Sequence, residues 1–341
     1  MRFESNNERA LEFRANLDLN HLLGEVNDKL STADSEYELG VAESFRPLFI
    51  VGPPRSGTTL FMQWLAASGL VSYPTNMLSR FYGAPLIGAK IQQLLTDPVY
   101  SFRDELTDLS PPRNFSSHNG KTSGALSPNE FWFFWRRFLR FETLDYAPDD
   151  ELRQNHDLDG LANGIKSLAN IFAKPFALKG MILNQSLPIL AEKFADPLFI
   201  WIKRDPLMTI QSILEARVKQ FGDDQHWYSF KIREYPELVS LQPVESVAGQ
   251  VASLNKSIDR GLGQLPPDQT LIVDYEAFCA QPGSFLTQLA GALGEEVARQ
   301  ARDLPSGFLN RSFPVRKTWS LSSSLRTTER IYRRALENEL Y

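Results

Sequence analysis

Cysteine, histidine and long apolar runs are scarce in this chain, and each scarcity excludes a class of protein. Cys279 is the single cysteine among 341 residues, which rules out an intrachain disulfide and is typical of a reducing, cytoplasmic compartment. No apolar run approaches the roughly 18 residues of a membrane-spanning helix, and the first residues lack the apolar core of a signal peptide. We therefore expect a cytoplasmic protein without a membrane span.

Charge, histidine placement and length narrow the class further. The formal net charge of −5 argues against a nucleic-acid-binding surface. The histidines are scattered without carboxylates at metal-ligand spacing, so we expect no metal site. The length exceeds the about 250–300 residues that usually share one core. We expect a helical extension over residues 1–46 and one α/β domain over residues 47–341, with a substrate-loop and helix insertion at about 70–145.

A glycine-rich loop follows the first apolar run. Residues 48–51 are apolar, the loop runs from Gly52 to Gly57, and an apolar helix comes next. The glycine spacing is that of a phosphate-binding loop, but Thr58 stands where that motif has lysine. Arg55 supplies a cation instead, beside backbone N–H groups at a helix N-terminus. We predict an anion cradle here; a plain turn into a core helix is the alternative.

Apolar strands alternate with helices along the rest of the chain. We predict strands at residues 48–51, 175–179, 198–203 and 270–273, and helices that include 60–67 and 205–217. This alternation predicts a P-loop-like three-layer α/β/α fold with a central parallel sheet and helical insertions. The acidic, polar residues 145–160 are expected to form a surface loop.

A second anion site is predicted where the 198–203 strand ends. Ligands of open α/β sheets bind at the carboxyl ends of the strands. Arg204 stands there, and Ser212 follows eight residues later on the next helix, so both can reach one phosphate. Together with the loop, this predicts a ligand with two anionic ends. The alternative is that Arg204 pairs with a neighbouring carboxylate such as Asp205, and that Ser212 is an ordinary surface serine.

An aromatic helix is predicted after a capping motif. Ser127 has the residue type of an N-cap, Pro128 suits the first turn, and Glu130 completes a capping box. The following residues 131–138 are aromatic on nearly every face. They form either part of the core or the apolar wall of a substrate pocket.

Taken together, these motifs resemble the sulfotransferases that use 3′-phosphoadenosine 5′-phosphosulfate (PAPS). Residues 54–59 resemble the 5′-phosphosulfate loop, in the arginine form of the bacterial, Golgi and tyrosyl-protein branches. Residues 199–206 with Ser212 resemble the 3′-phosphate-binding strand and helix, and residues 275–282 resemble a later element of the same fold. The implied donor-binding residues are Pro54, Arg55, Ser56, Gly57, Thr58, Thr59, Arg204 and Ser212.

The resemblance implies in-line transfer of a sulfuryl group from PAPS to a hydroxyl of a glycan or small molecule, without a metal. Arg55 is then the cation on the phosphosulfate, and Lys179 takes the place of a catalytic lysine. Arg316 and Lys317 lie in a basic segment that resembles a loop closing over the 3′-phosphate. A solvated run of charges is the alternative for that segment.

The general base departs from the family pattern. Where one branch has a histidine two residues after the lysine, this chain has Met181, and residues 73–77 hold no carboxylate where other branches use glutamate. Glu130 is our first substitute and His118 our second, although Glu130 is equally explained as a capping residue. Two other functions stay open: a P-loop kinase that uses ATP and Mg²⁺, and a non-catalytic relative that binds a nucleotide or a partner protein.

Overall fold

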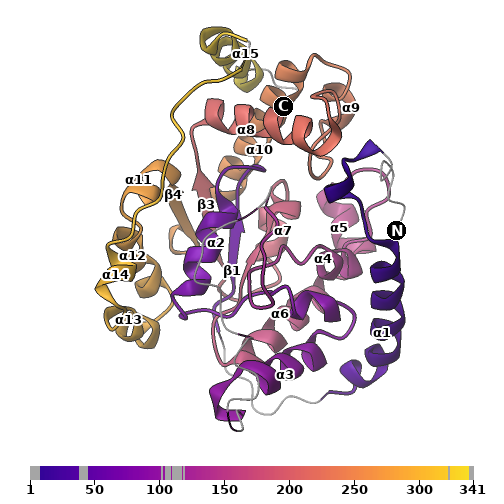
Figure 1. Cartoon of the computed structure of the whole chain (residues 1–341), viewed down its shortest axis with the longest axis vertical. Coiled ribbons are helices and arrows are strands. Elements are labelled where there is room, and N and C mark those ends of the chain that lie inside the picture. The colour runs from indigo at the N-terminus through magenta and orange to yellow at the C-terminus, as the bar shows by residue number, and fades with distance from the viewer. Residues whose placement is uncertain are drawn as a thin grey trace.

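Four parallel strands form the sheet around which the chain is organised (Figure 1). A computed structural model describes residues 8–37, 45–100, 103, 109, 117, 120–321 and 323–337. The strands are β1 (Leu48–Val51), β2 (Ala177–Lys179), β3 (Leu198–Lys203) and β4 (Thr270–Asp274), in the spatial order β2-β1-β3-β4. Because all four run in the same direction, their carboxyl ends meet at one edge of the sheet.

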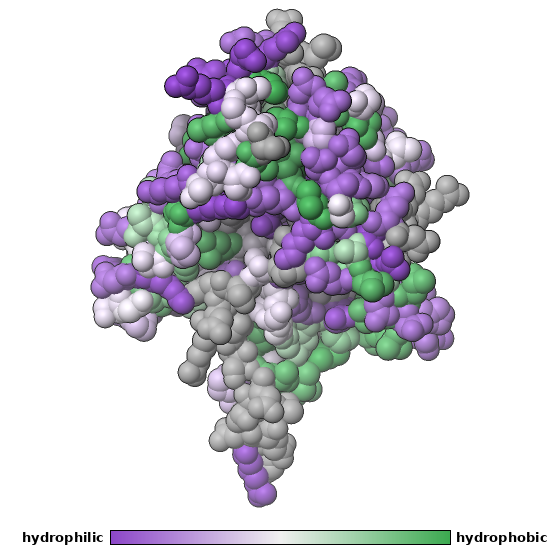
Figure 2. Space-filling model, turned by 45° about the horizontal axis from the view of Figure 1, so that its top comes forward, coloured by the Kyte–Doolittle hydropathy of each residue, from purple (hydrophilic) through white to green (hydrophobic). Residues whose placement is uncertain are grey.

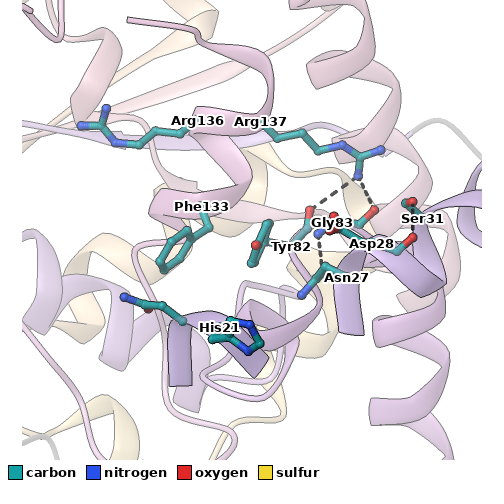
Figure 3. Close-up of a pocket in the computed structure, with 10 residues that line it drawn as sticks. His21, Asn27, Asp28, Ser31, Tyr82, Gly83, Phe133, Arg136 and Arg137 are labelled. Carbon is teal, nitrogen blue, oxygen red and sulfur yellow. Dashed lines mark hydrogen bonds between the residues drawn. The ribbon is translucent and has the colours of Figure 1, made fainter. Parts of the chain in front are cut away.

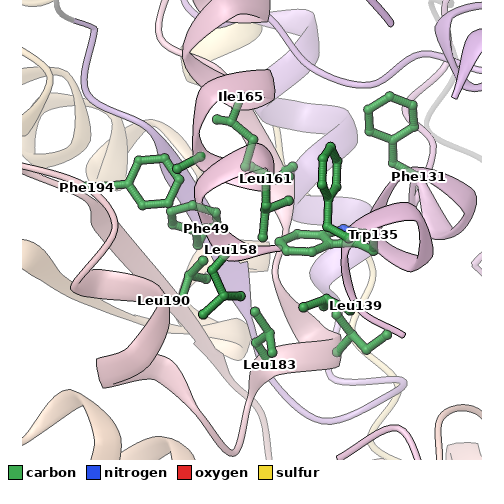
Figure 4. Close-up of a cluster of buried hydrophobic side chains, with 14 of the residues drawn as sticks. Phe49, Phe131, Trp135, Leu139, Leu158, Leu161, Ile165, Leu183, Leu190 and Phe194 are labelled. Atoms are coloured by element: carbon green, nitrogen blue, oxygen red, sulfur yellow. The ribbon is translucent and has the colours of Figure 1, made fainter. Parts of the chain in front are cut away.

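Both faces of the sheet are covered, because its strands are apolar on both sides. Phe49 and Val51 face a core cluster that includes residues of α6 (Leu158–Phe172) and α7 (Leu187–Ala191) (Figure 4). Leu48 and Ile50 face a second cluster with α2 (Thr58–Ala67) and the helices after β4. Those helices are α11 (Tyr275–Ala280), α12 (Gly283–Ala292), α13 (Glu295–Arg302) and α14 (Ser306–Leu309). The three-layer α/β/α prediction is confirmed.

The remaining helices surround this core. They are α1 (Leu17–Ser35), α3 (Pro85–Thr96), α4 (Trp132–Phe138), α5 (Asp149–Asn155), α8 (Pro206–Phe221), α9 (Tyr235–Leu238), α10 (Pro243–Leu262) and α15 (Leu325–Glu337). Short 3-10 turns lie at η2 (Leu11–Phe13), η3 (Leu78–Phe81), η4 (Pro98–Tyr100), η5 (Met181–Leu183) and η6 (Pro267–Gln269). Hydrophilic residues dominate the surface around α15, and apolar ones emerge in separate patches (Figure 2). Within the described residues, no helix is both long and apolar enough to cross a membrane.

The predicted strands and the helix after Asp205 are confirmed. The carboxylate of Asp205 accepts hydrogen bonds from the backbone N–H groups of Leu207 and Met208, at 2.7 and 3.2 Å, and so caps α8. The helix continues to Phe221, beyond the predicted end. Helix α2 starts at Thr58, two residues before its predicted start.

Two predictions of local structure are wrong. The predicted capping box does not form, because α4 begins only at Trp132, after Phe131 adopts a left-handed conformation with φ of 59°. Pro128 instead forms a bridge with Thr75, and Glu130 caps nothing. Residues 145–160 are not one loop, because α5 and the start of α6 bury Leu152 and Leu158 in the core, while their acidic residues remain outside.

Candidate active site

The loop between β1 and α2 has a backbone that few side chains would allow. Arg55 is left-handed with φ of 67°, and Gly57 has φ of 100°. A Cβ on Gly57 would stand 2.2 Å from Cε2 of Tyr275, so only glycine fits there. No side chain within the described residues caps α2, and its first N–H groups therefore face the loop. This is the geometry of an anion cradle.

Asn184 anchors Gly52 at the start of this loop, and the sequence analysis did not predict this residue. Its side-chain amide donates to the carbonyl oxygen of Gly52 at 2.8 Å and accepts from the N–H of Gly52 at 3.3 Å. Asn184 is buried just after η5, at the sheet edge where β2 ends. Because the two residues are 132 positions apart, no local pattern pointed to this contact.

Arg55 joins the two predicted anion sites. Its Nε donates to Oγ of Ser212 on α8 at 3.1 Å. In return, Nη1 of Arg204 donates to the backbone carbonyl of Arg55 at 2.8 Å. The strand ends of β1 and β3 therefore bring these three residues into direct contact. The alternative considered for Arg204, a pairing with Asp205, is not what the structure contains, since the carboxylate of Asp205 caps α8.

Tyr275 forms the floor between these two sites. The guanidinium of Arg204 lies over its ring, 4.9 Å from the centroid, and Gly57 packs against the ring edge. Burial raises the pKa of Tyr275 to about 12, so the phenol stays neutral. Within the described residues, the buried Oγ of Ser56 and Nε of Arg204 have no hydrogen-bond partner. Both groups can therefore donate a hydrogen bond to a ligand that carries acceptor oxygens.

Lys179, Glu130 and Thr59 form a second cluster beside the loop. Nζ of Lys179 donates to Oγ1 of Thr59 at 2.6 Å and pairs with Oε1 of Glu130 at 2.9 Å. The other carboxylate oxygen of Glu130 accepts from Nε1 of Trp132 at 2.6 Å. The lysine side chain is only 5% exposed, whereas that of Glu130 is 29% exposed. The carboxylate is therefore the member of the pair that solvent or a substrate can reach.

Burial and the neighbouring polar groups have opposing effects on the pKa of Glu130. Burial pushes the pKa of its carboxyl up, but the charge and hydrogen bond of Lys179, the hydrogen bond from Trp132 and the charge of Arg55 outweigh burial. The net result is a pKa below the ordinary glutamate value. Glu130 is consequently ionised at neutral pH and can accept a proton.

Tyr228 completes this cluster and was also missed by sequence reasoning. It is 8% exposed, and burial raises the pKa of its phenol. The charge and hydrogen bond of Arg55 and the charge of Glu130 also act on this pKa. Its backbone carbonyl accepts from Nε2 of Gln250 on α10 at 3.1 Å, which fixes the segment after α8. A lone tyrosine in a polar segment carries no sequence signal for this role.

Asn76, in the stretch 73–77 that holds no carboxylate, has a structural role. Its side-chain amide donates to the carbonyls of Thr122 and Gly124 and accepts from Nδ2 of Asn129 at 2.8 Å. Asn76 thus ties down residues 120–130, the segment that ends in Glu130. The carboxylate beside Lys179 thus comes from a segment that the amide of Asn76 holds in place.

Met181, Arg316, Lys317 and His118 remain of the residues that the sequence singled out. Met181 is buried, and its Sδ accepts from Oγ1 of Thr58 at 3.5 Å. Arg316 is paired with Glu215 of α8 at 2.5 Å, one turn beyond Ser212, and Lys317 is exposed. The structure therefore places the basic segment along α8, where Gln211, the residue before Ser212, donates to the carbonyl of Thr318 at 3.2 Å. His118 lies outside the described residues.

The fold and the loop define a P-loop-like α/β protein, and comparison with known proteins gives the family. A profile of the sulfotransferase family matches residues 47–299. The chain therefore belongs to the sulfotransferase family and is a transferase. No curated protein matches the chain in sequence.

Two crystal structures of bacterial sulfotransferases are similar in fold. Sulfotransferase STF9 from Mycobacterium avium shares 14% sequence identity and aligns with a TM-score of 0.53 over 94% of this chain and 83% of its own. Sulfotransferase STF1 from Mycobacterium tuberculosis H37Rv shares 15% identity, with a TM-score of 0.53 over 91% of this chain and 81% of its own. At these identities the likeness concerns the fold alone.

Proposed function

We propose that this protein transfers the sulfuryl group of PAPS to a hydroxyl of a glycan or small-molecule acceptor. One observation carries the proposal: Arg55 contacts both Ser212 and Arg204, so two anion-binding corners adjoin each other. A donor that bears a 5′-phosphosulfate and a 3′-phosphate has two charged groups for these corners. The donor-binding residues are those predicted from the loop, together with Arg204 and Ser212.

The free polar atoms of the site fit such a donor. The buried hydroxyl of Ser56 and the α2 N-terminus suit the 5′ end, and the unpartnered Nε of Arg204 suits the 3′-phosphate. PAPS supplies an activated sulfuryl group whose bond to the bridging phosphate oxygen breaks during transfer. Arg55 and Lys179 lie where they can stabilise the charge that develops on that oxygen.

Glu130 is the proposed general base. Its ionised, partly exposed carboxylate lies 2.9 Å from Nζ of Lys179, beside the loop. It takes the proton from the acceptor hydroxyl as the new bond from oxygen to sulfur forms. A loose transition state requires positioning and charge stabilisation more than a strong base, so a carboxylate with a lowered pKa is adequate. Tyr228 is proposed to orient Arg55 from the other side.

Two measurements on the full chain test this function. Calorimetry in the presence of a chelator should detect binding of 3′-phosphoadenosine 5′-phosphate (PAP), the desulfated donor. Radiolabelled PAPS with a panel of hydroxyl acceptors, and with water alone, should then give labelled product. Binding of ATP that requires Mg²⁺, without PAP binding, would indicate the kinase. PAP binding without any turnover of PAPS would indicate the non-catalytic relative.

A further inference from the structure

A pocket of about 600 Å³ lies between α1, the turn after η3 and α4. Phe133 of α4 and Tyr82 stack there with ring centroids 5.0 Å apart, and both are half-buried (Figure 3). His21 and Asn20 of α1 line the opposite side. The volume is that of a site for a small ligand or for part of a larger one. Helix α1 lies outside residues 47–299, so this wall is not part of the matched family region.

The pocket is formed before any ligand arrives. The side chain of Asn27 donates to the carbonyls of Leu23 and Arg80 and accepts from the N–H of Gly83 at 2.6 Å, which fastens α1 to the turn after η3. Arg137 of α4 donates to the carbonyl of Gly83 at 2.9 Å. These bonds hold three segments in fixed positions, so binding there requires little rearrangement.

Charge balance in the pocket disfavours an anionic ligand. Arg136 is paired with Asp145 at 2.5 Å, and the charge of Arg137 acts on the buried carboxylate of Asp34. Asp28 adds one further carboxylate to the rim. Both arginines therefore have anionic neighbours inside the protein, and neither offers an uncompensated charge to an anion.

Short polar side chains surround the stacked rings. The buried Nδ2 of Asn20 has no hydrogen-bond partner within the described residues. His21 and Asp28, both exposed, supply further donor and acceptor atoms on the same helix. An apolar ring face bordered by amide, imidazole and carboxylate groups matches a ligand with an apolar face and several hydroxyls.

Three chain segments connect this pocket to the proposed catalytic cluster. Phe133 is three residues after Glu130, so their Cα atoms are at most about 11 Å apart. Asp145, the partner of Arg136, also accepts from the N–H of Lys231, three residues after Tyr228. Nζ of Lys121 lies 5.8 Å from the ring centroid of Phe13, which comes just before α1. A Cβ on Gly120, the residue before Lys121, would be 3.4 Å from Oε1 of Glu130.

We propose that this pocket binds a neutral sugar ring of the acceptor and presents a neighbouring hydroxyl to Glu130. The inference rests on the proposed function for the transfer step, but sugar binding itself does not require the donor. Phe133 and Tyr82 provide the stacking face, and Asn20 and His21 bind ring hydroxyls. The N-terminal helix is then the element that selects the acceptor.

A glycan array of neutral mono- to tetrasaccharides, probed with the full chain in the absence of nucleotide, tests the proposal. At least one sugar should bind, and calorimetry on that sugar should give a dissociation constant about tenfold higher for Phe133→Leu, which keeps apolar volume but removes the ring face. Asn20→Ala, which leaves the aromatic stack intact, should also weaken binding. Tyr100→Leu, an exposed aromatic outside the pocket, is the matched control and should bind as the wild type does.

Benzoate and 1-naphthol serve as an anionic and an apolar competitor. Binding of either one that depends on Phe133, without binding of any sugar, overturns the proposal, and so does an array with no bound sugar. PAP binding is measured on the same samples. A chain that binds PAP but no sugar disproves this inference alone, whereas a chain that binds sugar but not PAP disproves the proposed function.

Discussion

The two halves of the candidate site are built in different ways. The donor half consists of one strand, loop and helix, plus an arginine and a serine that follow the neighbouring strand. The acceptor half draws Glu130 from a long insertion, Lys179 from β2 and Tyr228 from the segment after α8. The pocket beyond them uses α1, which precedes the matched family region.

This difference follows from what each half must recognise. A donor with fixed phosphate positions can be held by backbone geometry and a few basic residues, so a short motif suffices. An acceptor is recognised by shape and hydrogen bonding, which segments far apart in sequence supply together. In this chain Asn76 holds the segment that brings Glu130 to Lys179, so the position of the proposed base depends on long-range contacts.

Arg55→Ala gives the largest expected effect, because Arg55 connects the two donor corners and faces the acceptor cluster. We expect turnover of radiolabelled PAPS to fall about 1,000-fold, since a charged donor at the developing negative charge is lost. Arg260→Ala, an exposed arginine near the end of α10, is the control. Turnover close to the wild-type rate in Arg55→Ala would remove this residue from the mechanism.

Glu130→Gln tests the acceptor half alone. The amide oxygen can accept one of the two hydrogen bonds that the carboxylate accepts from Lys179 and Trp132, so we expect the fold and PAP affinity to persist while turnover falls about 100-fold through loss of the proposed base. Calorimetry and steady-state rates measure the two quantities. Glu192→Gln, in an exposed ion pair with Arg153, is the matched control. If turnover persists unchanged, the proton acceptor is another group.

Arg204→Ala tests the donor half alone. Loss of its charged hydrogen bonds should raise the PAP dissociation constant about 30-fold, or about 2 kcal/mol. The carbonyl of Arg55 also loses its partner, and we expect the effect in donor affinity to exceed any effect in acceptor affinity. Lys203→Ala, at the preceding exposed position, is the control. Unchanged PAP affinity would mean that the 3′-phosphate binds elsewhere.

The difference between the donor half and the acceptor half also determines which of their residues can be predicted from the sequence. The strands, the loop, Arg204 and Ser212 follow from local patterns, because buried strands and helix caps depend on neighbouring residues. The sequence did not predict Asn184 or Tyr228, whose partners are distant. It named Glu130 as the first candidate for the base, but explained the residue equally well by a helix cap that does not form. That local rule failed because Phe131 turns left-handed and Asn129 accepts its N–H, which delays the helix and leaves the carboxylate with Lys179.

Lys179→Met should lower turnover through loss of its charge, and it should also displace the pH profile, which is the smallest but most specific effect expected here. In the wild type the lowered pKa keeps the carboxylate of Glu130 ionised at every pH above the ordinary glutamate pKa of 4.5. The carboxylate becomes protonated, and the proposed base is lost, only as the pH falls through the lowered pKa. Burial is the strongest single influence on this group and raises its pKa. Without the lysine, burial is less opposed, and the acid limb of the turnover profile should move to higher pH.

Lys179→Met should also make the stability of the fold less dependent on pH in the acid range. A lowered pKa stabilises the fold above the unfolded value, and that contribution disappears as pH falls through the folded value. Thermal unfolding of Lys179→Met should therefore lose stability at neutral pH and show a weaker loss on acidification than the wild type. Lys193→Met, which breaks a surface pair with Asp159, should leave both profiles in place. If the acid limb of the turnover profile is the same in Lys179→Met and in the wild type, Lys179 does not control the ionisation of Glu130.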